Sequence, residues 1–178
     1  AVAGMAADGG LAEFVVWPAE LCQILPDTVA DEEAPFLEPG TVATHAVRRS
    51  GARIGDTVAV LGVGTVGMLA LQVLSSVGAR VIAIDLKHSN LELASLLGAD
   101  EVVDASQCDV SEQLLDLTNG IGPDIVLETS GSAQAPVQAI QSVRRQGRVV
   151  LVGIYSARPQ IHFNDIVGFE REVIGSLA

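Results

Sequence analysis

Residues 62–67, Gly-Val-Gly-Thr-Val-Gly, have the glycine spacing of a dinucleotide-binding turn. Glycine is abundant in this chain, so the motif alone is a weak signal. Its position strengthens it, because it follows the apolar run 57–61 and opens the apolar segment 65–76. That order is expected of a strand, a phosphate-binding turn and a helix.

Each position of the motif has a separate physical role in such a unit. Gly62 permits the tight turn, Gly64 lets the backbone approach a pyrophosphate, and Gly67 lets the helix pack closely on the sheet. The helix that opens at Thr65 and Val66 presents free backbone N–H groups to the phosphates. We therefore predict that these five residues contact a dinucleotide.

Asp85 ends the next apolar run, 80–85, and is the predicted specificity residue. A carboxylate at this strand end can accept hydrogen bonds from the adenosine ribose hydroxyls, and it repels the 2′-phosphate of NADP. The sequence therefore predicts NAD as the cofactor. Lys87, two positions later, lies over the adenine, partly offsets the charge of Asp85, or is an ordinary solvated lysine.

Two further turns follow apolar runs that read as strands. Thr129 comes directly after the run 124–128, and Gly153 and Ile154 follow the run 148–152. In an open parallel sheet the carboxyl ends of the strands line the ligand crevice. These residues are predicted to form backbone walls around the nicotinamide, with ordinary connecting turns as the alternative.

Strand-like and helix-like segments alternate regularly from residue 57 onward. This alternation predicts an α/β fold with a doubly wound, mostly parallel sheet of the Rossmann type. We assign residues 31–178 to this domain. Hydrophobic residues make up 49% of the chain but aromatic residues only 3%, so aliphatic side chains must fill the core. The predicted strands are 57–61, 80–85, 101–103, 124–128, 148–152 and 172–176, and the predicted helices between them are 65–76, 89–97, 111–118 and 133–143.

The first thirty residues differ from the rest of the chain. Residues 11–17 and 21–25 read as short strands, yet the nearby sequence offers them no hairpin or crossover partner. We interpret residues 1–30 as the tail of a neighbouring domain, or as strands supported by one, and the chain as part of a longer protein.

Helix boundaries are read from caps and helix-breaking residues. The helical pattern that starts near Ala30 is predicted to break at Pro39-Gly40, to resume over 41–49 and to end at Gly51. Ser89 and Glu92 have the spacing of a capping box, which is predicted to start the helix 89–97.

Charge and composition exclude several classes of partner. The formal net charge of −12 disfavours binding to nucleic acid or to anionic membranes. No apolar run approaches the roughly 18–20 residues of a membrane span, and no signal peptide is visible at the start of the sequence. Cys22 and Cys108 have no metal-ligand spacing. We expect a cytoplasmic protein with reduced thiols.

The sequence resembles the medium-chain, zinc-dependent alcohol dehydrogenase family, in its butanediol and sorbitol dehydrogenase branch. The resemblance covers essentially the whole chain, and it implies that residues 1–30 are the remnant of a catalytic domain. The segments that carry it are 8–16, Leu37-Glu38-Pro39, 45–49, 51–67, 149–154 and 174–177.

The resemblance implies an enzyme that transfers a hydride between a secondary alcohol or diol, or the matching ketone, and NAD. It also implies a catalytic zinc that polarises the substrate oxygen. The Gly-His-Glu motif that supplies zinc ligands in the family is missing from this sequence. Only Glu38 matches a position at the zinc, as a ligand or an exchanging neighbour. We assign no catalytic residue and expect the chain alone to bind NAD without turnover.

Three alternatives remain open at this point: a non-catalytic NAD-sensing module, a zinc-free quinone reductase, and a methyltransferase that uses a similar glycine-rich turn for S-adenosylmethionine. Asp85 counts against the quinone reductase, whose relatives commonly prefer NADPH. The final predicted strand, 172–176, is apolar and would lie at a sheet edge. An unpaired edge favours pairing with a second copy, so we expect a homo-oligomer.

Overall fold

The computed structural model describes residue 4 and residues 7–177, and contacts along the chain divide it into two units, Ala1–Pro35 and Phe36–Ala178. The predicted catalytic-domain remnant over residues 1–30 therefore lies partly outside the described residues. Its assignment to a second domain stays a prediction. None of the described helices is long and apolar enough to cross a membrane.

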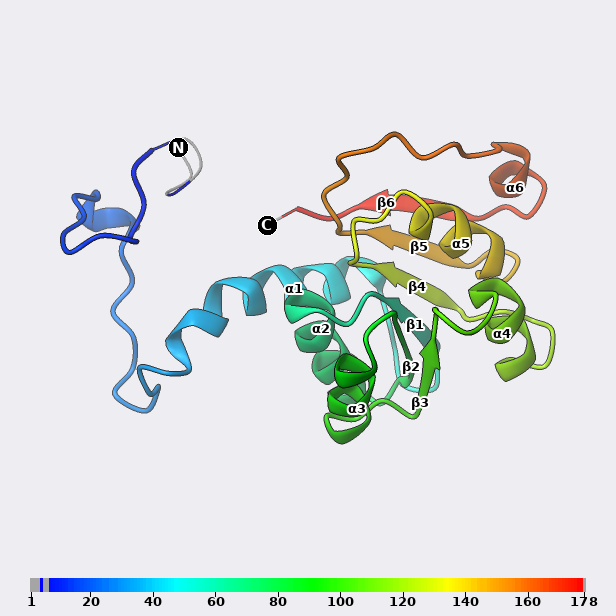
Figure 1. Ribbon diagram of the computed structural model, residues 1–178, viewed down its shortest axis with the longest axis horizontal. Coiled ribbons are helices and arrows are strands. Elements are labelled where there is room, and N and C mark those ends of the chain that lie inside the picture. Colours follow the sequence, from blue (N-terminus) through cyan, green and yellow to red (C-terminus); the bar gives the residue numbers. More distant parts are fainter. Residues whose placement is uncertain (1–3, 5–6, 178) are drawn as a thin grey trace. The chain divides into compact units, whose positions relative to one another are not determined.

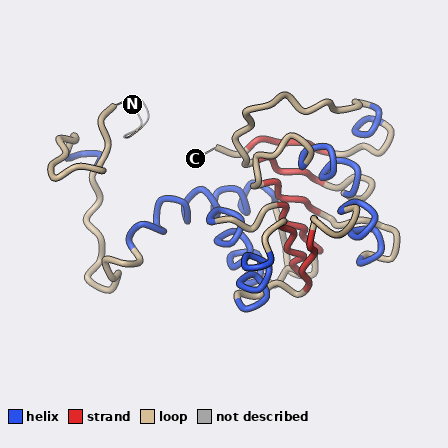
Figure 2. The backbone as a smooth tube through the Cα atoms, in the orientation of Figure 1, coloured by secondary structure: helices blue, strands red, loops and turns tan. Residues whose placement is uncertain are grey.

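The second unit is built on one parallel sheet, shown in Figures 1 and 2. Its order across the described residues is β3-β2-β1-β4-β5-β6, and every neighbouring pair is parallel. The predicted doubly wound Rossmann-type sheet is confirmed. The strands are β1 (Thr57–Leu61), β2 (Arg80–Asp85), β3 (Glu101–Asp104), β4 (Ile125–Glu128), β5 (Arg148–Leu151) and β6 (Glu172–Gly175).

Helices cover both faces of this sheet, which is why its central strands are apolar on both sides. In β1, for example, Val58, Ala59 and Val60 are all fully buried although their side chains alternate between the faces. Val58 and Val60 pack with the helices α1–α3, and Ala59 packs with α4 and α5. The helices are α1 (Leu37–Ser50), α2 (Thr65–Ser76), α3 (His88–Leu96), α4 (Val110–Leu117), α5 (Ala135–Ser142) and α6 (Asn164–Val167).

The strand order reverses direction at β1, and this reversal positions the site. β1 pairs with β2 on one side and with β4 on the other. Leu61, at the carboxyl end of β1, lies opposite Ile84 of β2 and Glu128 of β4. The connections that leave β1 and β4 run to opposite faces, so a crevice opens between them at the carboxyl ends.

The two predicted N-terminal strands are wrong. Residues 11–17 form bends and irregular chain, and the short 3-10 helix η1 (Ala19–Leu21) leads into the irregular residues 22–26. Leu11 and Val16 are almost fully exposed. An apolar segment becomes a strand only when a neighbouring strand supplies hydrogen bonds, and the described residues supply none to this one.

Two predictions about helix boundaries are also wrong. Pro39-Gly40 does not interrupt the helix, because α1 runs unbroken from Leu37 after the 3-10 helix η2 (Ala34–Phe36). Pro39 is the third residue of α1, where the missing N–H has no intrahelical acceptor to lose. The capping box at Ser89 also fails: α3 begins one residue earlier, and its N-cap, Lys87, makes no side-chain cap bond. The predicted C-terminal glycine of α1, Gly51, is confirmed in the left-handed conformation.

Candidate functional site

The glycine-rich turn lies between β1 and α2, at the head of the crevice. Gly62 has φ +90°, and its N–H donates to the carbonyl of Ile84 over 2.8 Å. A Cβ at Gly62 would lie 2.6 Å from the Cβ of Ser130, in the loop after β4. Both the positive φ and this close approach require glycine at the turn.

The other two glycines of the motif have contrasting surroundings. A Cβ at Gly67 would overlap the carbonyl of Gly62 and lie 2.7 Å from Oγ1 of Thr129, so α2 packs tightly against the turn. A Cβ at Gly64, the N-cap of α2, would meet no atom within 4 Å. Gly64 and Thr65 are exposed and Val66 is half-buried. The start of α2 therefore faces open space, with the first backbone N–H groups of the helix available to a ligand.

Asp85 connects the end of β2 to this turn. Its carboxylate accepts hydrogen bonds from the backbone N–H of Val63 at 2.9 Å and of Lys87 at 2.9 Å. The side-chain amide of Asn90 donates to the same carboxylate at 3.2 Å. The carboxylate is half-buried and is held in place by groups on both sides of it.

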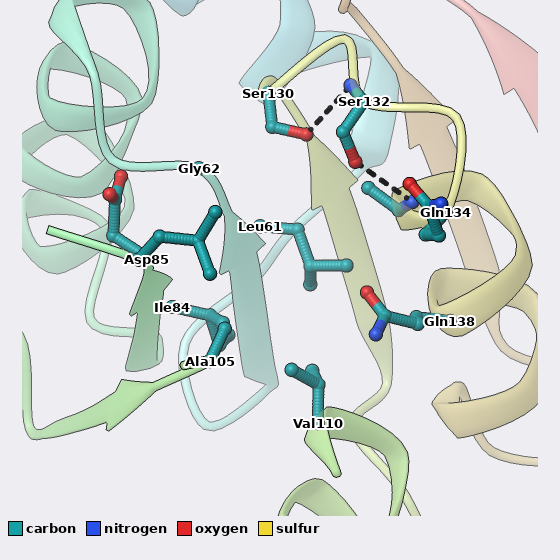
Figure 3. Close-up of a pocket in the computed structure, with 12 residues that line it drawn as sticks. Leu61, Gly62, Ile84, Asp85, Ala105, Val110, Ser130, Ser132, Gln134 and Gln138 are labelled. Carbon is teal, nitrogen blue, oxygen red and sulfur yellow. Dashed lines mark hydrogen bonds between the residues drawn. The ribbon is translucent and has the colours of Figure 1, made fainter. Parts of the chain in front are cut away.

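A cavity of about 270 Å³ opens beside Asp85 (Figure 3). Asp85 and the turn border it on one side, and polar side chains from the loop after β4 and from α5 border it on the other. Apolar side chains lie between the two borders. Its lining residues are Leu61, Gly62, Ile84, Asp85, Leu86, Ala105, Val110, Ser130, Ser132, Gln134, Ala135 and Gln138.

Lys87 borders a different cavity. Gly64, Thr65 and Lys87 line a hollow of about 600 Å³ together with apolar side chains of α2 and α3, among them Met68 and Leu93. The structure thus places Asp85 in the first cavity and Lys87 in the second, with the glycine-rich turn contributing to both.

The loops after β4 and β5 pack against each other at the far side of the crevice. Thr129 donates its backbone N–H to the carbonyl of Leu61 over 2.9 Å, and its hydroxyl bonds to the carbonyl of Gly62. A Cβ at Gly153 would lie 2.5 Å from the backbone nitrogen of Gly131. Ile154, next in the chain, is 82% exposed at this wall.

Glu128, the last residue of β4, is a site residue that the sequence analysis did not single out. It is fully buried, and its carboxylate accepts hydrogen bonds from the N–H of Ser130 at 2.8 Å, the hydroxyl of Ser130 at 2.5 Å and the N–H of Gly131 at 3.0 Å. The hydroxyl of Tyr155 also donates to it. Burial, together with this hydrogen bond, raises the pKa of Tyr155. The available signal was a charged residue closing an otherwise apolar strand.

Glu38 is the second residue of α1, and its side chain is exposed. Its backbone carbonyl accepts a hydrogen bond from the hydroxyl of Thr41 at 2.7 Å. Within residue 4 and residues 7–177, no group of three or more His, Cys, Asp or Glu side chains is placed to hold a metal ion. The described residues therefore do not form a zinc site by themselves.

The carboxyl edge of the sheet fits a dinucleotide. Gly64 leaves the start of α2 open, Gly62 and Gly67 allow the close packing around it, and Asp85 presents a fixed carboxylate next to an apolar cavity. A pyrophosphate requires the open helix start, and an adenosine ribose requires the fixed carboxylate.

A sequence profile described as zinc-binding dehydrogenase matches residues 65–178. A sorbitol dehydrogenase from Halalkalibacterium halodurans is 37% identical over 95% of this chain and 50% of its own length. An (R,R)-butanediol dehydrogenase from Bacillus subtilis is 38% identical over 94% of this chain and 48% of its own length. The chain therefore spans about half the length of these curated relatives.

Solved structures of similar proteins contain both kinds of nicotinamide cofactor. A short chain alcohol dehydrogenase from Escherichia coli CFT073, complexed with NADH, matches with a TM-score of 0.91 and 31% identity over 99% of this chain and 52% of that one. A zinc-binding dehydrogenase from Sinorhizobium meliloti 1021, bound to NADP, matches with a TM-score of 0.89 and 33% identity over 96% and 52%.

Proposed function

The chain belongs to the zinc-binding dehydrogenase family, in its sorbitol and butanediol dehydrogenase branch, and on that premise we propose that it is the NAD-binding part of an alcohol or diol dehydrogenase. The whole enzyme would transfer a hydride between a secondary alcohol or diol, or the matching ketone, and NAD. The proposed substrate class is that of the similar sorbitol dehydrogenase and (R,R)-butanediol dehydrogenase.

The observation that carries the choice of NAD is the placement of Asp85. Its carboxylate lies at the end of β2, bonded to the turn at Val63 and facing the first cavity. In the proposed complex it accepts hydrogen bonds from the ribose hydroxyls and repels a 2′-phosphate. Since similar structures contain NADH in one case and NADP in another, the fold alone does not set this preference.

The remaining predicted residues have proposed roles in holding the dinucleotide. Gly64, Thr65 and Val66 would present backbone N–H groups to the pyrophosphate at the start of α2. Thr129, Gly153 and Ile154 would form the wall beside the nicotinamide, and Lys87, at the second cavity, would lie near the adenosine end. Gly62 and Gly67 would contact the dinucleotide through the turn that they shape.

The nicotinamide ring, when bound, supplies the hydride acceptor for alcohol oxidation. The part of this chain in the reaction is to bind the dinucleotide, to orient its ring and to keep water from one side of it. We propose that Glu38 is one zinc ligand or a neighbour that exchanges with a ligand. The other zinc ligands would come from outside the described residues.

Calorimetric titration of the purified chain with NAD+, NADP+ and S-adenosylmethionine tests the proposal. We expect NAD+ to bind at least about tenfold more tightly than NADP+, since loss of one charge-assisted hydrogen bond costs about 1.5–3 kcal/mol. Equal affinities for the two nicotinamide cofactors would remove the specificity role of Asp85. Binding of S-adenosylmethionine in place of both would contradict the dehydrogenase assignment.

A further inference from the structure

Two loops of the proposed cofactor crevice converge on one buried carboxylate, that of Glu128. A carboxylate without solvent is costly unless its oxygens are fully hydrogen-bonded. In the described residues both of its oxygens have donors, and the donors come from different loops. The placement of these loops is therefore coupled to Glu128.

One oxygen, Oε1, holds the loop after β4. It accepts hydrogen bonds from the N–H and hydroxyl of Ser130 and from the N–H of Gly131. The hydroxyl of Ser130 in turn accepts from the N–H of Ser132 at 3.1 Å, and both serines line the cavity beside Asp85 (Figure 3). Oε1 thus sets the wall of the cavity proposed to hold the adenosine.

The other oxygen, Oε2, holds the loop after β5. It accepts the hydrogen bond from Tyr155, and a Cβ at Gly153 would lie only 2.6 Å from it. The backbone carbonyl of Glu128 also accepts from Val152 at 2.8 Å and from Gly153 at 3.1 Å. Oε2 thus sets the backbone proposed to lie beside the nicotinamide.

We propose that Glu128 is a positioning residue that orients the two halves of the dinucleotide separately, the adenosine side through Oε1 and the nicotinamide side through Oε2 and Tyr155. The inference rests on the proposed binding of NAD. It assigns a task to each oxygen, and this division can be tested because AMP is the adenosine half of NAD.

The central experiment is calorimetric titration of the purified 178-residue chain and its Tyr155→Phe variant with AMP and with NAD+. Phenylalanine keeps the ring but removes the donor to Oε2. We expect the variant to bind NAD+ roughly five- to tenfold more weakly, in line with the loss of a charged hydrogen bond, and to bind AMP as the unaltered chain does.

The two variants Glu128→Gln and Glu128→Ala test the carboxylate itself. Glutamine retains one acceptor oxygen for Ser130 and Gly131, so we expect its AMP affinity to stay within about threefold of the unaltered chain. Alanine removes both side-chain acceptor oxygens and leaves their buried donors unpaired, so we expect it to weaken the binding of AMP and of NAD+ by at least about tenfold.

Thr118→Val is the matched control for lost stability. The Thr118 hydroxyl is buried, donates to Leu114 over 2.6 Å and accepts from Gly122 at 2.9 Å, away from the crevice. We expect this variant to unfold at lower denaturant concentration while binding both ligands normally. If Thr118→Val lost as much affinity for the two ligands as the Glu128 variants do, lost stability would explain both effects, and Glu128 would have only a structural role.

The remaining outcomes separate the two proposals. If the unaltered chain binds neither ligand, the proposed function fails, and the positioning role fails with it. If the unaltered chain binds NAD+ but Tyr155→Phe weakens AMP as much as NAD+, or weakens neither, only the divided role of Glu128 is overturned. Should Glu128→Ala fail to fold, Tyr155→Phe and Glu128→Gln still decide the matter.

Discussion

Asp85 combines two tasks at the residue scale: it holds the glycine-rich turn through Val63, and it faces the proposed ribose site. The hydrogen bonds from Val63, Lys87 and Asn90 fix the carboxylate before any ligand arrives. A preorganised acceptor loses little conformational freedom on binding, which favours affinity.

The charge of Asp85 can be separated from its acceptor role with Asp85→Asn. The amide retains one acceptor oxygen for the turn, but it no longer repels a phosphate. We expect NAD+ affinity to fall about tenfold and the preference for NAD+ over NADP+ to shrink by more than that. Titration calorimetry with both cofactors measures the change; an unaltered preference would show that another residue selects the cofactor.

Gly64 and Gly67 should respond in opposite ways to an added methyl group. Gly64→Ala fills open space at φ −70°, so we expect the free energy of unfolding to change by less than about 0.5 kcal/mol, but NAD+ affinity to fall. Gly67→Ala pushes a Cβ into the turn, and we expect a loss of about 1–3 kcal/mol in urea unfolding. Undiminished NAD+ binding by Gly64→Ala would place the pyrophosphate elsewhere.

Tyr155 offers a direct spectroscopic view of the buried carboxylate, because it is the one tyrosine in the sequence. Burial and the hydrogen bond to Glu128 raise the pKa of Tyr155. The neutral hydroxyl therefore stabilises the fold in full at pH values below the ordinary tyrosine pKa of about 10. That contribution is lost as the pH rises through the folded-state pKa. We expect tyrosinate absorbance to appear only above pH 10, and at lower pH in Glu128→Gln. If Tyr155 titrates near the ordinary value of about 10 in the folded chain, its hydrogen bond to Glu128 is not buried.

Among the elements, α4 has the best-defined cap. The side chain of Asp109 accepts hydrogen bonds from the N–H groups of Ser111 at 2.9 Å and Glu112 at 3.1 Å. We expect Asp109→Ala to lower the free energy of unfolding by about 1 kcal/mol. Ser111→Ala, which keeps its backbone donor, is the control, and urea denaturation is the measurement. Equal stability of the two variants would show that the cap contributes little.

Most elements of the sheet unit could be predicted because their local signals agree with their packing. The apolar runs that became β1 and β2 are buried on both faces, and their ends match the prediction. Residues 11–17 carry a similar apolar pattern but remain irregular. A strand depends on a partner strand, and the identity of a partner is not a property of the segment itself.

The site could be predicted in part for the same reason. Gly62, Gly64, Gly67 and Asp85 have a fixed spacing because one strand, one turn and one helix connect them locally. Glu128 is close in sequence to its donors Ser130 and Gly131, but its donor Tyr155 lies 27 residues later in the chain. Only the pairing of β4 with β5 brings Glu128 and Tyr155 together. The sequence alone therefore indicated only a strand that ends in a charged residue.

At the scale of the whole molecule, β6 lies at the edge of the sheet among the described residues, as predicted. Glu172 and Ser176 donate backbone N–H groups toward β5, so by alternation the N–H of Gly175 points away from the sheet. The homo-oligomer through this edge remains a prediction.

Gly175→Pro removes the outward backbone donor of this edge, at a position where an added Cβ meets no atom within 4 Å. We expect the unaltered chain to sediment as a dimer in analytical ultracentrifugation, Gly175→Ala to remain dimeric and Gly175→Pro to become monomeric, because proline cannot continue a strand ladder. A monomer before substitution, or a dimer after it, would exclude pairing through β6.

The position of Lys87 at the second cavity has a practical consequence. It is the one lysine in the sequence, so an amine-reactive dye has a single side chain to modify, besides the N-terminal amine. That side chain is exposed and follows Asp85 by two residues. A fluorophore can therefore be attached at Lys87 without any substitution. Binding of the cofactor would then be measured as a change in the emission of this fluorophore.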